Sequence, residues 1–249
     1  MKTRLITHPV PVAHALGAFA GSVVVAIDVL RASTTLCAAL AAGAAPVFAV
    51  ESIAQARALA QRMQPRPLLA GETQCLRPEG FDLGNSPLEM TPAAVAGRAI
   101  VASTTNGTRA LAAGAGAELL LLTAFVNLSA TVDHIAAAGP RTVHLVCAGA
   151  DGKLAQDDVA FAGALARALL DLLPDLAPDA STREALTVAP ANLSPSTVLA
   201  TLLNSGPGQR LVGLGMEADV RFAARVDALP FAVRGRPTPH GVELAVTRL

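Results

Sequence analysis

The sequence predicts a three-layer α/β fold, in which a largely parallel sheet carries helices on both faces and the C-terminal part is less regular. Three observations predict it. Continuous apolar runs such as 22–28 are typical of strands buried on both faces. Apolar residues at helical spacing lie between these runs. The two patterns alternate through the first two thirds of the chain, which is typical of parallel sheets.

The first stretch of this alternation ends in a long polar loop. The expected strands are 22–28, 46–50 and 67–70. One helix is expected around Leu36, and another begins at Ser52, where Gln55 three residues later completes a capping-box pattern. Residues 71–98 are polar and rich in Gly and Pro. A loop of this length inside a compact domain is usually functional.

The alternation then resumes and weakens beyond Pro174. The expected strands are 99–103, 119–123 and 142–147, and the expected helices are 107–113, 129–138 and 159–173. Several prolines interrupt the pattern after Pro174, and two short strands are expected at 231–233 and 242–246. We therefore expect one α/β domain over residues 1–249, with room for a smaller C-terminal subdomain from about residue 175.

Composition excludes several classes of function. Of the 249 residues, 52% are hydrophobic and 15% are charged, which excludes a disordered chain. The chain has no Trp or Tyr with which to stack single-stranded nucleic acid. Its 19 basic and 19 acidic residues balance, so it lacks the positive charge that a nucleic acid requires. Composition does not exclude a small anionic ligand that is held by a few local groups.

Cysteine spacing and apolar segments predict a cytoplasmic protein with no membrane partner. The three cysteines match neither a zinc site nor a disulfide framework: they are Cys37, Cys75 and Cys147. The uncharged stretch 32–50 is rich in Ala, Gly and Thr and contains Pro46, so it is a poor spanning helix. Pro9 and Pro11 interrupt the apolar core that a signal peptide needs.

The strongest candidate site follows the first expected strand. Asp28 ends that strand, and Arg31, Ser33, Thr34 and Thr35 follow at a helix start. A helix start offers unpaired N–H groups to an anion, and an arginine fork suits two anionic oxygens. The alternative is structural, with Ser33 or Thr34 capping the helix and Asp28 pairing with Arg31. We favour an anion site beside a carboxylate, because an Asp and an Arg exceed what capping needs.

A similar set of residues follows a later strand. Asn106 and Gly107 tolerate positive φ, so backbone amides there can converge on an anion. The alternative is an ordinary turn between strand and helix. The candidate phosphate-binding residues of this segment are Thr105, Asn106, Gly107, Thr108 and Arg109.

Acidic residues near other expected strand ends are candidate metal ligands. They are Glu72, Asp82, Asp151 and Asp158, in addition to Asp28. Carboxylates beside an anion site are what Mg²⁺-assisted phosphoryl chemistry requires. Asp157 and Asp158 are neighbours at a helix start, so we expect at most one of them to face the site. The alternative is that these acids only cap helices and turns.

Three motifs resemble those of the 2-phosphosulfolactate phosphatases: they are 28–35, 80–87 and 104–111. Shorter matches follow in order at 125–127, 147–149 and 157–163, and fainter ones at Asp219 and Asp227. The resemblance covers roughly residues 22 to 170. It implies an α/β fold and a Mg²⁺-dependent hydrolase that releases phosphate from (R)-2-phospho-3-sulfolactate, a step towards coenzyme M. The loop 73–79 departs from the family pattern, which bears on the choice of substrate.

We therefore expect a Mg²⁺-dependent phosphatase that converts this ester, or a related small phosphomonoester, to 3-sulfolactate and phosphate. The expected catalytic residues are Asp28, Arg31 and Asp82, and the expected metal ligands are Asp28, Glu72 and Asp158. Asp28 would either attack phosphorus or hold the metal while water attacks. The alternatives are a non-catalytic binder of small anions and a structural subunit whose apolar surface serves a homo-oligomer.

Overall fold

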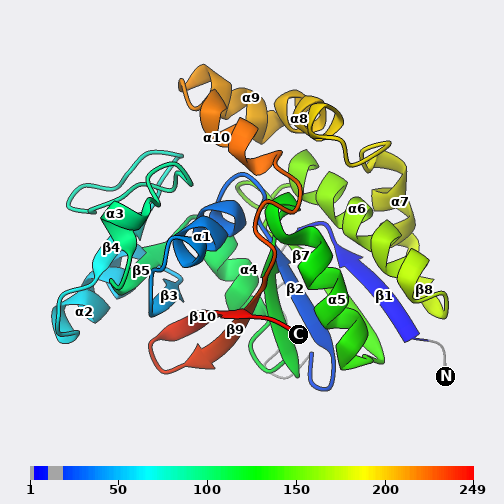
Figure 1. The fold of residues 1–249 in the computed structure, drawn as a ribbon, viewed down its shortest axis with the longest axis horizontal. Helices are drawn as coiled ribbons and strands as arrows, with labels where there is room; N and C mark the ends of the chain where they lie inside the picture. Colours follow the sequence, from blue (N-terminus) through cyan, green and yellow to red (C-terminus); the bar gives the residue numbers. More distant parts are fainter. Residues whose placement is uncertain (1–2, 11–18) are drawn as a thin grey trace.

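The computed structural model describes residues 3–10 and 19–249, whose strands form one ten-stranded sheet in the order β4-β5-β3-β10-β9-β6-β2-β7-β1-β8 (Figure 1). The strands are β1 (Thr3–His8), β2 (Val23–Ile27), β3 (Val47–Val50), β4 (Leu68–Gly71), β5 (Ile100–Ser103), β6 (Leu119–Thr123), β7 (Thr142–Cys147), β8 (Leu176–Pro178), β9 (Ala232–Thr238) and β10 (Gly241–Thr247). The predicted α/β class, with helices on both faces of a mostly parallel sheet, is confirmed. Pro11, which bears on the signal-peptide prediction, lies outside the described residues.

A hairpin joins two parallel groups of strands. β4, β5 and β3 form one group, and β6, β2, β7, β1 and β8 form the other. β9 and β10 lie between them and pair antiparallel with each other, with β6 and with β3. The two groups therefore run in opposite directions. This hairpin is the pair of closing strands that the sequence predicts.

The chain passes from one group to the other through two crossover connections. β2 leads through α1 (Ala32–Ala41) to β3, and β5 leads through α4 (Gly107–Ala113) to β6. α1 and α4 contact each other and lie between the two groups (Figure 1). Each crossover starts from the middle of a parallel set, because β2 lies between β6 and β7, and β5 lies between β3 and β4. The two similar sequence segments at residues 28–35 and 103–109 are the starts of these crossovers.

Alternate residues of the strands face different cores. In β2, Val23, Val25 and Ile27 pack with α5 and α6, whereas Val24 and Ala26 pack with α1 and α4. A third, smaller core lies under α2 beside β4 and β5. The remaining helices are α2 (Ile53–Arg62), α3 (Pro92–Val95), α5 (Leu128–Ala138), α6 (Gln156–Leu172), α7 (Ala180–Val188), α8 (Pro195–Asn204), α9 (Gly206–Gly213), α10 (Glu217–Ala223) and the 3₁₀ turn η1 (Phe125–Asn127). Burial on both faces explains why these strands read as continuous apolar runs.

The structure adds elements that the sequence analysis missed. β1 and β8 extend the sheet at one edge, and α7 to α10 occupy most of residues 180–223. Some of the prolines that seemed to interrupt the pattern open helices instead: Pro195 is the first residue of α8, and Ser194 caps it. Within the part of the chain that the structure describes, no helix is both long and apolar enough to cross a membrane.

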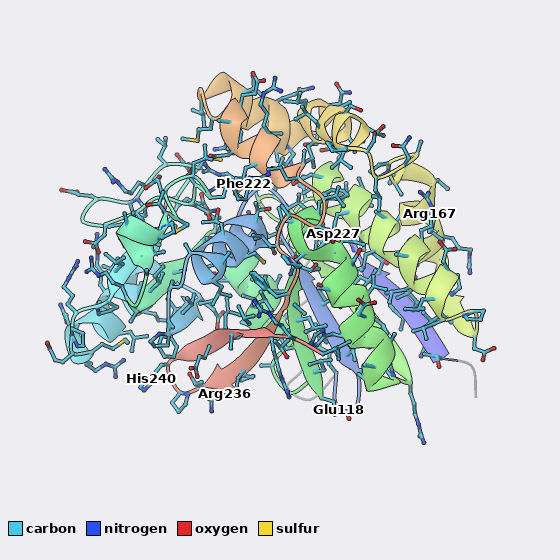
Figure 2. The ribbon with its side chains drawn as sticks, in the orientation of Figure 1. Glu118, Arg167, Phe222, Asp227, Arg236 and His240 are labelled. Atoms are coloured by element: carbon cyan, nitrogen blue, oxygen red, sulfur yellow. The ribbon has the colours of Figure 1, made fainter. Side chains whose placement is uncertain are left out.

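The segment before β9 is tied to the start of α5. The Asp227 carboxylate accepts hydrogen bonds from the Ser129 amide (2.7 Å) and hydroxyl (2.6 Å). Figure 2 labels Asp227 near one end of α5. A carboxylate at this position also suits the positive end of the helix dipole. Asp227 therefore ties the segment between α10 and β9 to the start of α5, and it does not line the cavity described below.

Gly163 permits the close packing of α6 on α7. A Cβ atom at this position would lie 2.1 Å from the Ala185 carbonyl oxygen. We expect Gly163→Ala to lower the free energy of unfolding by about 1–3 kcal/mol, because overpacking forces the helices apart. Urea denaturation measures this loss.

Gly213→Ala is the matched control for Gly163→Ala. A Cβ atom at Gly213, which also lies in a helix, would meet nothing within 4 Å. We expect this substitution to be neutral or to stabilise by up to about 1 kcal/mol. Equal stability of the two variants would contradict the tight contact between α6 and α7.

Candidate functional site

A cavity of about 590 Å³ lies where the loops after four strands meet. Asp28 follows β2, Glu72 follows β4, Thr105 follows the end of β5, and Gly149 follows β7, and all four line the cavity. The starts of α6 and α9 complete its wall. The ends of four strands thus meet in one cavity, although the strands come from two groups that run in opposite directions.

Four carboxylates that line the cavity form a group that we call the acidic cluster: Asp28, Glu72, Asp157 and Asp158. The expectation that at most one of Asp157 and Asp158 faces the site is wrong. Both lie in the first turn of α6, under the loop that follows β2. Asp158 accepts from the Val29 amide (2.9 Å) and the Gly149 amide (3.0 Å), and Asp157 accepts from the Leu30 amide (3.2 Å). The amides of Val29 and Leu30 thus donate hydrogen bonds to Asp158 and Asp157, respectively.

Burial dominates the electrostatics of the acidic cluster. It raises the pKa of Asp28 to about 6 and the pKa of Asp157 to about 7, and repulsion between the neighbouring carboxylates adds to both shifts. Burial and the same repulsion raise the pKa of Asp158 well above its usual range. The cluster therefore favours any species that reduces its negative charge, whether a proton or a cation.

The donor atoms of the cluster fit a hard cation. Asp157 Oδ1 is buried and has no hydrogen-bond partner among the described residues. That part of the chain holds no group of three or more His, Cys, Asp or Glu side chains arranged as a ready metal site. Mg²⁺ does not require one, because it keeps several waters and takes one or two carboxylates. Asp28 and Asp157 are the side chains best placed for that role.

The other two carboxylates of the cluster fix loops. Glu72 accepts from the Thr105 amide (2.7 Å) through Oε1 and from the Cys75 amide (2.8 Å) through Oε2. Both oxygens of Asp158 are likewise engaged by backbone amides. Glu72 and Asp158 therefore hold the ends of four strands in place, and their predicted role as metal ligands stays a prediction.

The hydroxyls at the start of α1 serve the same loop and do not line the cavity. The Asp28 amide donates to Ser33 Oγ (3.0 Å), and Thr34 Oγ1 donates to the Val29 carbonyl (2.8 Å). Thr35 Oγ1 donates to the Asn85 carbonyl (3.2 Å). All three hydroxyl residues are buried. This placement gives no support to direct phosphate binding. The structural alternative also fails as stated, because neither Ser33 nor Thr34 caps α1 and the ion pair of Arg31 is with Asp219.

The segment before α4 is only partly at the cavity. Thr105 and Asn106 line it, whereas the Thr108 hydroxyl is buried and donates to the Thr104 carbonyl (3.0 Å). Gly107 lies against the acidic cluster, because a Cβ atom there would come within 2.5 Å of Asp28 Oδ2. Arg109 is exposed and is not part of the lining, so its predicted phosphate contact gains no support from its position.

Arg31 lines the cavity but is already paired. It is 4% exposed, and its Nη1 donates to Asp219 Oδ2 (2.5 Å) on α10. Its Nη2 donates to the Cys75 carbonyl (2.8 Å), and Ser86 Oγ donates to the other Asp219 oxygen (2.6 Å). Arg31 thus joins three segments around the cavity, and its ion pair is with Asp219 rather than with Asp28.

Asp82 lies away from the cavity. One of its oxygens accepts from Arg66 (3.1 Å) and the other from the Leu69 amide (2.8 Å), which fixes the start of β4. The same loop reaches the cavity through Asn85 instead. The predicted catalytic role of Asp82 therefore stays a prediction that its position does not support.

Two basic residues of the cavity escaped the sequence analysis as candidates. Lys153 lies in the loop after β7, and Arg210 lies on α9. Arg210 Nη1 is 3.9 Å from Asp151 Oδ2, and Asp151 also lines the cavity. No sequence pattern connects α9 to the strand ends, so only the fold could reveal Arg210.

The chain is similar to proteins named as phosphatases of one kind. A family model described as 2-phosphosulpholactate phosphatase matches residues 10–235. A probable 2-phosphosulfolactate phosphatase of Deinococcus radiodurans is 40% identical over 88% of this chain and 91% of its own. Proteins of the same name are 40% identical in Thermus thermophilus (86% and 89% covered) and 38% identical in Caldanaerobacter subterraneus (82% and 83% covered).

The ion pair of Arg31 with Asp219 should stabilise the fold strongly, because removing one partner leaves a buried charge. We expect Asp219→Ala to lower the free energy of unfolding by about 3–5 kcal/mol. Urea denaturation followed by circular dichroism measures this change.

Glu217→Ala on the same helix is the control. Glu217 pairs with Arg221, and both side chains are largely exposed. We expect a loss below about 1 kcal/mol for this surface pair. Similar losses in the two variants would show that the buried Arg31–Asp219 pair stabilises the fold no more than an exposed pair does.

Proposed function

Because the chain belongs to the 2-phosphosulfolactate phosphatase family, it is a phosphoric monoester hydrolase, and we propose that it hydrolyses (R)-2-phospho-3-sulfolactate to 3-sulfolactate and phosphate with the help of Mg²⁺. The observation that carries the proposal is the meeting of the acidic cluster with basic side chains in one cavity. A phosphate ester and a divalent cation together match this arrangement of charges.

Charge balance explains why the proposal includes a cation. A phosphate dianion next to Asp28 and Asp157 would be repelled by both carboxylates. The cation would be held by Asp28 and by the unpartnered oxygen of Asp157. When bound, Mg²⁺ supplies charge neutralisation at the phosphate oxygens and polarises the ester.

The residues around this position keep it rigid. Glu72 holds the loop after β4 to the loop after β5, and Asp158 holds the loop after β2 to the loop after β7. Arg31 ties both the loop after β2 and the loop after β4 to α10. Polar groups that are fixed before the substrate arrives need little rearrangement during the reaction, which is the main source of electrostatic catalysis.

Two routes of hydrolysis use Asp28, and both need its negative charge. In one, an Asp28 oxygen attacks phosphorus, the ester P–O bond breaks, the sulfolactate oxygen takes a proton, and water then hydrolyses the aspartyl phosphate. In the other, water attacks phosphorus directly while Asp28 helps to hold the metal. Burial raises the pKa of Asp28, and a cation held beside it would oppose that rise and favour the ionised form.

Metal removal tests the proposed cofactor. Purified protein should release phosphate from (R)-2-phospho-3-sulfolactate, should lose this activity in EDTA, and should regain it with excess Mg²⁺, because a hard cation held by few protein ligands is exchangeable. Phosphate release measured with a colorimetric assay gives the result. Full activity after exhaustive chelation would remove the metal from the proposal.

Replacement of Asp28 tests the central residue. Asp28→Asn keeps the shape of the side chain but removes its charge, and we expect turnover to fall by more than about 100-fold, the scale of losing a nucleophile or a metal ligand. Asp133→Asn, on an exposed position of α5, is the matched control and should keep normal turnover.

The route is then decided by trapping. Acid quenching during turnover, followed by mass spectrometry of the peptide that contains Asp28, detects a phosphoryl group if Asp28 is the nucleophile. Turnover without a trapped group assigns Asp28 to metal binding. Normal hydrolysis by a folded Asp28→Asn variant would show that Asp28 has neither role.

A further inference from the structure

Lys153 and Arg210 are the basic side chains of the cavity whose charge is open to a ligand. Among the described residues that line it, the other cation is Arg31, and the buried carboxylate of Asp219 already neutralises that one. Lys153 and Arg210 are both exposed. The positive charge that a bound anion meets in this cavity therefore comes mainly from these two side chains.

A tight turn fixes the position of Lys153. The Ala150 amide donates to the Lys153 carbonyl (2.9 Å), and the Lys153 amide donates to the Ala150 carbonyl (2.9 Å). Between them, Asp151 and Gly152 have φ values of +51° and +75°, the left-handed pair that a two-residue Asp-Gly turn uses. The turn lies between β7 and α6, and Lys153 lines the same cavity as the acidic cluster.

Arg210 lies between two loops that border the cavity. Its guanidinium is 3.9 Å from the Asp151 carboxylate in the turn. Burial raises the pKa of the Cys75 thiol, in the loop after β4, and the charge of Arg210 opposes that rise. The pair with Asp151 is exposed on both sides and contributes little to stability, so a ligand can compete for the guanidinium. A planar fork of this kind suits carboxylates and sulfonates.

We propose that Lys153 and Arg210 bind the acidic groups of the substrate that do not react, while the acidic cluster and its cation receive the phosphate. This inference rests on the proposed function and assigns the residues that recognise the part of the substrate beyond its phosphate group. Esters without further acidic groups bind through the phosphate alone.

Three esters with the same carbon skeleton test the inference. Isopropyl phosphate has no further acid group, 2-phospholactate has a carboxylate, and 2-phospho-3-sulfolactate has a carboxylate and a sulfonate. For the wild-type protein kcat/KM should increase in that order. Lys153→Gln and Arg210→Gln should each lower kcat/KM for 2-phospho-3-sulfolactate by about 10- to 100-fold, mainly through KM, which is the scale of one lost charge-assisted hydrogen bond.

The ratio of kcat/KM between 2-phospho-3-sulfolactate and isopropyl phosphate is the decisive quantity. It should fall at least about 10-fold in each variant, because only the first ester has groups for the two cations to bind. Arg234→Gln removes an exposed arginine of β9 that does not line the cavity, and it should leave the ratio unchanged. An unchanged ratio in both Lys153→Gln and Arg210→Gln would overturn the inference and leave the proposed function standing.

Calorimetry with 3-sulfolactate separates the two proposals, because this molecule has the acid groups but no phosphate. The wild-type protein should bind it, more weakly as salt increases, and both Gln variants should bind it at least about 10-fold less tightly. If no ester is hydrolysed while this difference persists, the proposed reaction fails and the binding inference holds. Equal binding by wild type and variants would overturn the inference whatever the activity.

Discussion

The carboxylate of Asp158 holds together the segments from which the cavity is built. One oxygen accepts from the Val29 amide after β2, the other accepts from the Gly149 amide after β7, and the side chain itself stands at the start of α6. These amides lie beyond the ends of their strands, so Asp158 satisfies donors that the sheet leaves unpaired. Its position also brings Asp157 beside Asp28. The acidity of the cavity is therefore partly a consequence of how its loops are fixed.

Sequence reasoning succeeded where the physical signal is local. Strands buried on both faces read as apolar runs, and Asp28 and Glu72 could be placed at the cavity because each directly follows such a run. It failed where partners are distant: Arg31 and Asp219 are separated by 188 residues, and nothing near either residue indicates the pair. The error about Asp157 has the same origin, since helix geometry alone ignores the loop that lies over the first turn of α6.

The β9–β10 hairpin joins two strand groups of opposite direction, and both groups contribute to one site. It separates the two parallel groups and pairs with the inner strand of each, β3 on one side and β6 on the other. α1 and α4 fill the space between the groups, and their starts bring Asp28 to Gly107. A side chain at Gly107, where the second crossover starts, would overlap the Asp28 carboxylate, where the first crossover starts. Asp28 can therefore keep its position only because residue 107 has no Cβ atom.

The exchange of strands between groups has a consequence for synthesis of the protein on the ribosome. No two of β1, β2, β3 and β4 pair with each other, although they include some of the most apolar segments of the described chain. β3 and β4 gain their shared neighbour only when β5 has been made, and β2 must wait for β6 and β7. The first third of the nascent chain thus emerges with no native sheet partner of its own. A holdase chaperone binds exposed apolar strands of this kind. Slow translation would lengthen the time during which these strands are unpaired and able to aggregate.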